Sequence, residues 1–142
     1  MKIAILVGIF LVSFSGCKKE QSPEPVQQTP YEKWQSRTFH DYTIDQKRTC
    51  FCPNAGELVR ITVHSDTVAQ VIRVADTSVV TYPFYFTVDS LFAMIRNAKT
   101  DSLVIRYNGQ YGYPEHLDVN PQQHPVDGGF LYETSNLQVE QR

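Results

Sequence analysis

The stretch LVRITVHSDTVAQVIRV, residues 58–74, decides the fold class of this chain. Every second residue from position 59 to position 63 is apolar, which is the period of a β-strand with one buried face. Ser65 and Asp66 then form a two-residue turn, short enough to join two antiparallel strands. We expect a second strand after this turn, with an apolar pattern continued by Val68, Ile72 and Val74.

The residues before this hairpin predict a third strand and a short helix. Residues 38–50 contain strand-like stretches around Tyr42 and Ile44. Residues 31–35, which include the only tryptophan, Trp34, can form a short helix before them. Three consecutive strands with short connections form an antiparallel meander.

After the hairpin the hydrophobic period changes to that of a helix. Thr87 is a residue type that caps helices, and Asp89 in the first turn favours the positive end of the helix dipole. The apolar residues that follow have the spacing of one helix face: Val88, Leu91, Phe92 and Ile95.

A second set of three strands follows this helix, with the hydrophobic alternation visible at residues 103–107, 117–119 and 130–134. Asn108-Gly109 begins the turn between the first two. The order predicts an α+β fold, with an antiparallel β-sheet of about six strands in two three-strand meanders and one or two helices on one face.

Residues 1–16 have the form of a bacterial lipoprotein signal peptide. The apolar run that follows Lys2 is about a dozen residues long, well short of the roughly 20 that cross a bilayer as a helix. Small residues then precede Cys17. We expect Cys17 to be the lipidated first residue of the mature protein, with palmitate or a similar acyl chain. The alternative is an ordinary secretory signal that leaves Cys17 as a free thiol.

The chain beyond Cys17 divides by composition into three parts. Residues 17–30 are polar and rich in proline, so we expect a flexible tether. Residues 31–135 supply one domain, and residues 136–142 a polar C-terminal tail. Lys18 stands where an aspartate would hold a lipoprotein at the inner membrane, so resemblance to lipoproteins of two-membrane bacteria implies the outer membrane, on its periplasmic side or at the cell surface. The acyl chains make the membrane itself a predicted partner.

Charge and motif content argue against several functions. The net charge is −2 and acidic and basic residues are interspersed, so we expect no nucleic-acid partner. The sequence holds no nucleophile elbow, glycine-rich phosphate loop or metalloprotease motif. We therefore expect a non-enzymatic domain without a cofactor, which binds or scaffolds an unidentified envelope protein or ligand.

Cys50-Phe51-Cys52 is the motif of the domain with the most reactive side chains, and it permits three interpretations. Cysteines two apart in a straight strand are too distant for a disulfide, but Pro53 makes a local kink plausible. The pair can therefore be a structural disulfide, two reduced thiols, or a redox or metal pair in an envelope thiol protein.

A metal site has little support in the spacing of possible ligands. One C-x-C without a matched second pair is a weak zinc signal. His64 and His116 alternate with apolar residues and fall on the solvated face of their strands, while His40 and His124 lie in loops. We expect no metal.

Two aromatic segments are candidate contact surfaces. Tyr107, Tyr111 and Tyr113 surround a glycine-containing turn, and tyrosines on turns are common in binding surfaces. The alternative is that Tyr107 and Tyr113 pack over the sheet edge. A second run, residues 82–86, precedes the helix, and we expect Phe84 and Phe86 to enter the core.

Short motifs follow one another along the domain: Trp34 with the aromatic strand after it, CFCP at 50–53, the strand from Val59 to Val63, TVDSLF at 87–92, Tyr107, GYP at 112–114, Asp118 and Asp127. Together they resemble the bacterial lipoprotein family known as domain of unknown function 6174. The resemblance implies a lipid-anchored or secreted small α+β domain and brings no activity with it. The chain departs from the family at the first hairpin turn, where the family tends to have Asp-Gly.

Overall fold

The computed structural model describes residues 27–140 of the chain. The predicted signal peptide, the lipidation site Cys17 and the tether up to residue 26 lie outside the described residues. Within the described part, no helix is both long and apolar enough to cross a membrane.

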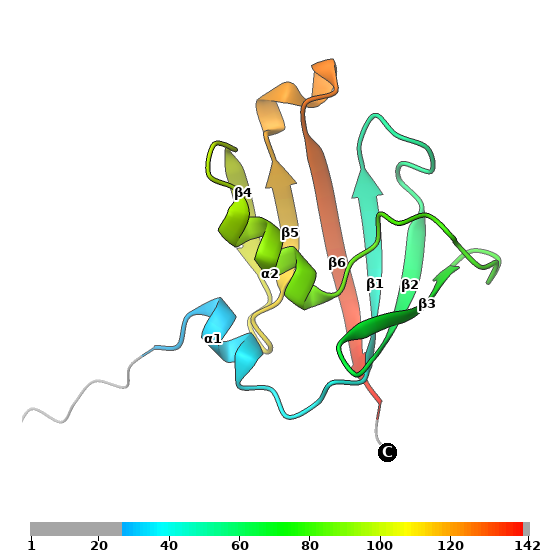
Figure 1. Cartoon of the computed structure of the whole chain (residues 1–142), viewed down its shortest axis with the longest axis vertical. Helices are drawn as coiled ribbons and strands as arrows, with labels where there is room; N and C mark the ends of the chain where they lie inside the picture. The colour runs from blue at the N-terminus through cyan, green and yellow to red at the C-terminus, as the bar shows by residue number, and fades with distance from the viewer. Residues whose placement is uncertain (1–26, 141–142) are drawn as a thin grey trace, which may run out of the picture.

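A helix followed by three antiparallel strands occurs twice along the chain, as Figure 1 shows. All six strands join one sheet in the order β3-β2-β1-β6-β5-β4, so the two meanders meet where β1 pairs with β6. This confirms the predicted α+β fold. The elements are α1 (Pro30–Gln35), β1 (Tyr42–Thr49), β2 (Leu58–His64), β3 (Thr67–Arg73), α2 (Val88–Asn97), β4 (Leu103–Tyr107), β5 (Pro114–Val119), the 3₁₀ helix η1 (Pro121–Val126) and β6 (Phe130–Val139).

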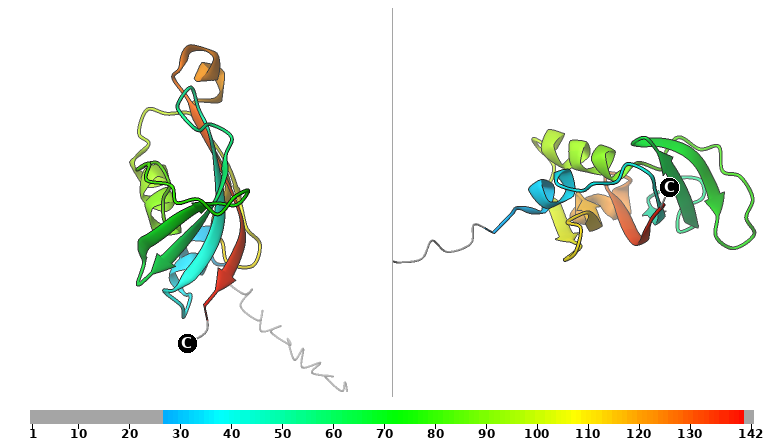
Figure 2. Two further views of the ribbon diagram at one scale, coloured as in Figure 1. Left: turned by 90° about the vertical axis from the view of Figure 1, so that its right-hand side faces the viewer. Right: turned by 90° about the horizontal axis from the view of Figure 1, so that it is seen from below.

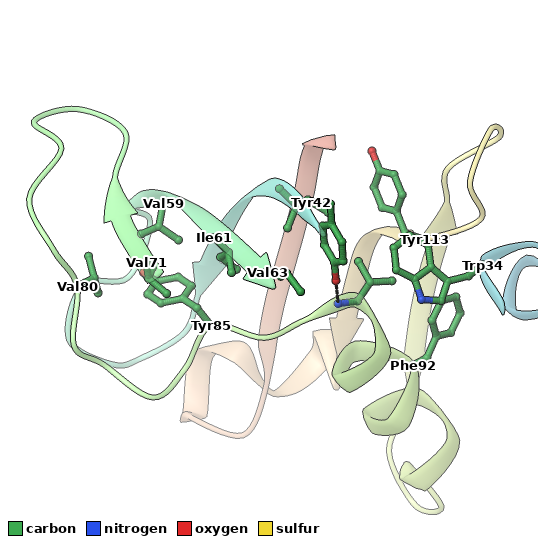
Figure 3. Close-up of a cluster of buried hydrophobic side chains, with 12 residues drawn as sticks. Trp34, Tyr42, Val59, Ile61, Val63, Val71, Val80, Tyr85, Phe92 and Tyr113 are labelled. Atoms are coloured by element: carbon green, nitrogen blue, oxygen red, sulfur yellow. Dashed lines mark hydrogen bonds between the residues drawn. The ribbon is translucent and has the colours of Figure 1, made fainter. Parts of the chain in front are cut away.

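Both α-helices lie on one face of the sheet, and no helix of residues 27–140 lies over the opposite face (Figure 2). The ring of Tyr31 in α1 meets the ring of Phe92 in α2 edge to face, with centroids 5.2 Å apart. Phe92 in turn stacks on Tyr107 of β4 at 6.0 Å. The two helices therefore share one core with the sheet, and the packing in Figure 3 lies between them and the strands.

Local signals explain where the helices begin. Thr29 and Glu32 form a capping box in which the Thr29 hydroxyl accepts from the Glu32 N–H and the Glu32 carboxylate accepts from the Thr29 N–H. Thr87 accepts from the Ser90 N–H at 3.1 Å and so caps α2, as predicted. The buried face of α2 includes Val88, Leu91 and Phe92.

The largest buried cluster combines α1, α2 and the first meander. Trp34 is fully buried and meets Phe39 and Tyr42 edge to face at 5.9 and 5.6 Å. A second cluster lies under α2 on the other meander and contains Leu91, Leu117, Val119 and Tyr132.

The predicted buried face of β3 is wrong after its first residues. Ala69 is an extra residue between two pairs of the β2–β3 ladder, Val63 with Val68 and Thr62 with Gln70. This bulge reverses the alternation, so Val71 faces the core with 8 % exposure and Val74 is 39 % exposed. The turn itself forms as predicted, with positive φ at Ser65 and Asp66.

The boundaries of the domain differ from the prediction at both ends. Thr29 caps α1 and Pro30 is its first residue, so this helix begins inside the predicted tether. β6 continues to Val139, which pairs with Tyr42, although we expected a polar tail from residue 136. The strand continues through polar residues because its backbone pairs with β1, whatever the side chains.

Candidate binding surface at the loop end of the sheet

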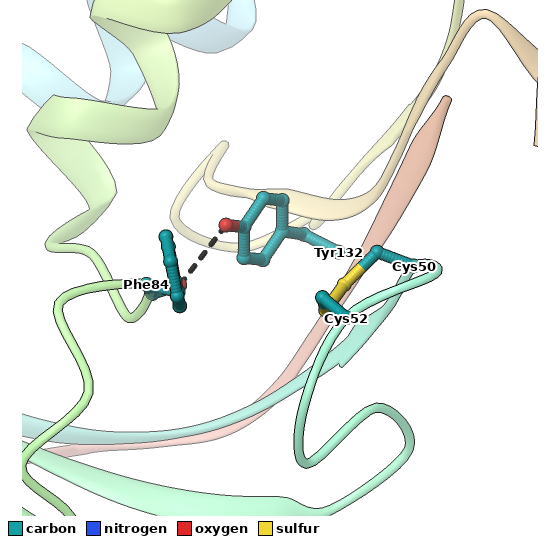
Figure 4. Close-up of a disulfide and its surroundings, with 4 residues drawn as sticks. All are labelled: Cys50, Cys52, Phe84 and Tyr132. Carbon is teal, nitrogen blue, oxygen red and sulfur yellow. Dashed lines mark hydrogen bonds between the residues drawn. A yellow bond between two sulfur atoms is a disulfide. The ribbon is translucent and has the colours of Figure 1, made fainter. Parts of the chain in front are cut away.

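The connection between β1 and β2 is a compact loop, residues 50–57, at the end of the sheet opposite α1 (Figure 1). The Gly56 N–H donates to the Arg48 carbonyl at 2.7 Å, which closes the loop at its base. Cys50 and Cys52 are joined by a disulfide, with Cα atoms 5.3 Å apart (Figure 4). Of the three interpretations of this pair, the structure has the disulfide, made possible by the bend of the chain directly after Thr49.

The disulfide loop holds an exposed aromatic side chain. Phe51 lies between the two bonded cysteines and is 82 % exposed. Val126, at the end of η1, is 78 % exposed and lies in the β5–β6 connection, which crosses the same end of the sheet. Both are large apolar residues that the fold places in solvent.

Two further aromatic residues, from the segment before α2, lie beside this loop. Tyr82 and Phe84 are 43 % and 39 % exposed, and both border a small pocket together with Cys52. The expectation that Phe84 enters the core is wrong, because the neighbouring Tyr85 takes the buried position with 8 % exposure. We call Phe51, Tyr82 and Phe84 the aromatic surface.

A basic side chain, Arg48, packs against Phe84 of the aromatic surface. The Arg48 guanidinium lies 4.5 Å from the centre of the Phe84 ring and 5.8 Å from the rings of Phe130 and Tyr132. The Tyr132 hydroxyl donates to the Phe84 carbonyl at 2.9 Å, a bond that Figure 4 shows. Burial raises the pKa of Tyr132 to about 12, although the charge of Arg48 acts in the opposite direction.

The tyrosine hairpin is not the exposed turn that a binding role requires of it. Tyr113 is 4 % exposed, and Tyr107 and Tyr111 pack against the main core cluster. Gly112 has a φ of +79°, and a Cβ there would lie 2.3 Å from the Pro30 carbonyl oxygen. The hairpin therefore packs against α1. The alternative interpretation expected Tyr107 and Tyr113 to pack over the sheet edge, and it did not include this contact with α1.

Ion pairs at the α1 end of the molecule link loops and helices to one another. The guanidinium of Arg37 contacts Asp66 at 2.7 Å and Asp89 at 2.8 Å, and His40 contacts the same Asp66 at 2.6 Å. These contacts join the α1–β1 connection to the β2–β3 turn and to α2. An open hollow of about 420 Å³ beside them is lined by Phe39, His40, Asp66 and neighbouring residues.

The face of the sheet opposite the two α-helices carries ion pairs across neighbouring strands. Asp45 receives two bonds from Arg60, at 2.7 and 3.0 Å, and a third from Asn136 at 2.9 Å. Burial alone raises the pKa of Asp45, but these bonds and the charge of Arg60 outweigh it and hold the pKa below its ordinary value. Lys47 pairs with Glu133 at 3.3 Å. These charges already have partners within the chain, so this face offers little unpaired charge to a ligand.

The histidines and carboxylates do not gather into a metal centre in the part of the chain that the structure describes. Residues 27–140 hold no group of three or more His, Cys, Asp or Glu side chains placed to bind one ion. His64 is exposed and contacts Asp41 at 3.0 Å, and His124 contacts Asp118 at 2.9 Å.

The fold and this surface define a small antiparallel α+β domain with a disulfide-closed loop at one end of its sheet. Residues 27–139 match the family of unknown function DUF6174, and the chain belongs to that family. No curated protein and no solved structure matches the chain.

Sequence analysis missed Arg48 and the exposure of Phe51. Arg48 follows Ile44 and Gln46 at intervals of two, so its position in the alternation indicates the helix-covered face. An arginine on the covered face of a strand is a signal from which Arg48 could have been selected as a candidate site residue. The exposure of Phe51 follows only from the bend at the cysteine pair.

Proposed function

We propose that this protein is a lipid-anchored module of the bacterial cell envelope that binds a partner protein through the aromatic surface and performs no catalysis. The observation that carries the proposal is the 82 % exposed Phe51, held between two bonded cysteines. The lipoprotein signal ending at Cys17 supports the anchor, and Lys18 supports an outer-membrane location.

The arrangement of the domain suits this role. α1 is where the chain enters the domain from the tether side, and the disulfide loop lies at the other end of the sheet (Figure 1). The aromatic surface can therefore face away from the point of attachment. An exposed aromatic ring supplies a large contact area, and the bonded loop loses little freedom when it binds.

The anchor is tested with Cys17→Ser in the natural host. Acyl chains at Cys17 hold the protein to membranes, so the variant is expected in the soluble envelope fraction and the natural protein in the detergent-soluble membrane fraction. Separation of inner and outer membranes then gives the location. A Cys17→Ser protein that still sediments with membranes and is released only by detergent contradicts lipidation at Cys17.

The binding surface is tested with a photo-crosslinking amino acid at position 51. The matched control carries it at position 104, because Val104 is also apolar and 51 % exposed but lies on the edge strand β4. We expect a discrete protein adduct in cells from position 51 and none from position 104. Equal labelling from both positions, or none from either, contradicts binding through this surface.

The rival function is thiol chemistry, and the bonded, partly exposed Cys50–Cys52 pair favours it over a metal role. It predicts mixed disulfides with other envelope proteins that disappear in the Cys52→Ser variant. The binding proposal predicts that cross-linking from position 51 survives replacement of both cysteines.

A further inference from the structure

Arg48 differs from the other arginines of the sheet in having no carboxylate beside it. Arg60, Arg73 and Arg106 each pair with an Asp or Glu, at 2.7, 3.0 and 3.8 Å. Among the ion pairs of residues 27–140, none includes Arg48, although its guanidinium is packed among aromatic rings. A guanidinium with two buried and unpaired nitrogen atoms is stabilised by an anion close by.

Arg48 lines a pocket together with a second residue that has an unpaired donor. The pocket lies under the disulfide loop and between the loop and the segment before α2, and its lining includes Arg48, Asn54 and Phe84. Arg48 Nε and Nη1 and Asn54 Nδ2 are buried, and none of them makes a hydrogen bond to another described residue. Three buried N–H donors without a hydrogen bond thus belong to two side chains that line one pocket.

The charged groups around the pocket do not neutralise the positive charge of Arg48. Glu57 is the acidic residue of the same loop, and its carboxylate already pairs with Arg73 at 3.0 Å. Tyr85 and Tyr132 next to Arg48 have pKa values raised by burial, so both are neutral at ordinary pH.

We infer that this pocket binds a carboxylate group. A carboxylate accepts at about four lone-pair positions, enough for all three donors, whereas a neutral oxygen accepts about two hydrogen bonds and brings no charge. The guanidinium of Arg48 presents a planar fork that matches the two carboxylate oxygens. The aromatic rings around it exclude water, which strengthens each charged bond.

The size of the pocket determines how much of a ligand can enter it. The cavity measures about 10 Å³, room for one water-sized group. One carboxylate oxygen enters, the second stays at the mouth of the pocket in reach of the Arg48 fork, and the rest of the ligand lies outside against Tyr82 and Phe84, which are partly exposed. This inference rests on the proposed function and makes it more specific, since the partner is expected to present an acidic side chain or a chain end to the aromatic surface.

The disulfide loop positions one wall of the pocket. The Ala55 N–H donates to the Cys52 carbonyl at 3.4 Å and the Glu57 N–H to the Asn54 carbonyl at 3.3 Å. Asn54 has a φ of +62°, a conformation that asparagine adopts more readily than most residues. Reduction of the disulfide loosens this wall and is expected to weaken carboxylate binding without abolishing it.

The test is a titration of the full-length lipidated protein in detergent, with ¹⁵N-labelled arginine and asparagine, followed by NMR. Sodium acetate replaces sodium chloride at constant ionic strength. We expect the Arg48 Nε–H and Asn54 side-chain signals to shift and saturate. Arg48→Lys keeps the charge but loses the fork, and it should weaken acetate binding at least about tenfold. Arg106→Lys, an exposed arginine paired with Glu115, should change it by less than about twofold.

A second variant covers the case in which Arg48→Lys does not fold. Asn54→Gly removes one donor and keeps the positive φ of the loop without strain, and it should weaken acetate binding about threefold or more. N-acetylglycine and N-acetylglutamate amide then show whether a chain end or an acidic side chain binds more tightly. No acetate-dependent shift, or unchanged affinity in the variants that fold, overturns the inference. If acetate does not bind but position 51 still gives a protein adduct, the carboxylate inference is rejected and the proposed function is kept. If acetate binds but position 51 gives no adduct, the carboxylate pocket is kept and the proposed function is rejected.

Discussion

The hydroxyl of Tyr42 accepts a hydrogen bond of 3.2 Å from the backbone N–H of Val88, and this bond joins the middle of the sheet to the first turn of α2 (Figure 3). The first N–H groups of a helix have no partner within the helix. Gln46 on the same strand binds the N–H and the carbonyl of Phe86 at 3.1 and 3.3 Å. Two polar side chains of β1 therefore fix where α2 begins.

Tyr42→Phe should destabilise the domain by about 1–3 kcal/mol, because it leaves the buried Val88 N–H without its acceptor while keeping the ring. The free energy of unfolding from urea titration measures the loss. Tyr31→Phe serves as the control, since Tyr31 is 38 % exposed, and should change stability by less than about 0.5 kcal/mol. A stable Tyr42→Phe protein would show that the N–H finds another acceptor.

Stability should fall as the pH rises above 10, because buried tyrosines must ionise on unfolding. Burial raises the pKa of Tyr132 from 10.0 to about 12, so its contribution is complete below pH 10 and is lost as the pH rises to 12. The shift corresponds to about 3 kcal/mol at most. Urea titrations between pH 8 and pH 12 should show a smaller fall for Tyr132→Phe than for the natural protein, with Tyr42 and other buried tyrosines causing the rest.

The sequence predicted those parts of the fold that depend on local periodicity. β2 and α2 each keep one hydrophobic period from end to end, so their types and buried faces follow from the residues alone. The bulge at Ala69 left no such trace, because one extra residue changes the register with β2 and not the composition. Long-range pairing likewise extends β6 to Val139.

The candidate surface was less predictable, because burial of an aromatic residue in a turn depends on distant segments. Tyr113 and Phe51 both lie in turn regions of the sequence, yet their exposures are 4 % and 82 %. Packing of α1 on the β4–β5 hairpin accounts for the first value, and Lys33 Nζ donates to the Gly109 carbonyl at 2.7 Å in that contact. No segment among the described residues covers Phe51 in this way.

Gly112→Ala should destabilise the domain by about 1–3 kcal/mol or more, because alanine is strained at the φ of +79° and its Cβ would strike the Pro30 carbonyl oxygen. The matched control is Gly109→Ala in the same hairpin, where a Cβ has no atom within 4 Å. Thermal unfolding followed by the fluorescence of Trp34 reports both effects. Equal melting temperatures for the two variants would contradict close packing of α1 on the hairpin.

Leu91→Ala should cost about 2–5 kcal/mol, because Leu91 is fully buried between α2 and the second meander. A loss of this size is a large fraction of the stability of a domain this small. Asn97→Ala, at the exposed end of the same helix, provides the control and should stay within about 0.5 kcal/mol. A Leu91→Ala protein with an unchanged melting temperature would mean that α2 does not pack on the sheet.

Replacement of Cys50 and Cys52 by serine should lower stability by about 0–3 kcal/mol, because a disulfide that closes so small a ring restricts the unfolded chain little. The backbone bond from Gly56 to Arg48 also closes the loop and remains in the variant. Two measurements are needed, urea unfolding of the double variant and a thiol count on the denatured natural protein without reductant. We expect no reactive thiol from either cysteine before reduction and two after it. Two reactive thiols in the unreduced protein would contradict the structural disulfide, and a double variant that folds but loses its cross-linked partner would favour thiol chemistry over binding by Phe51.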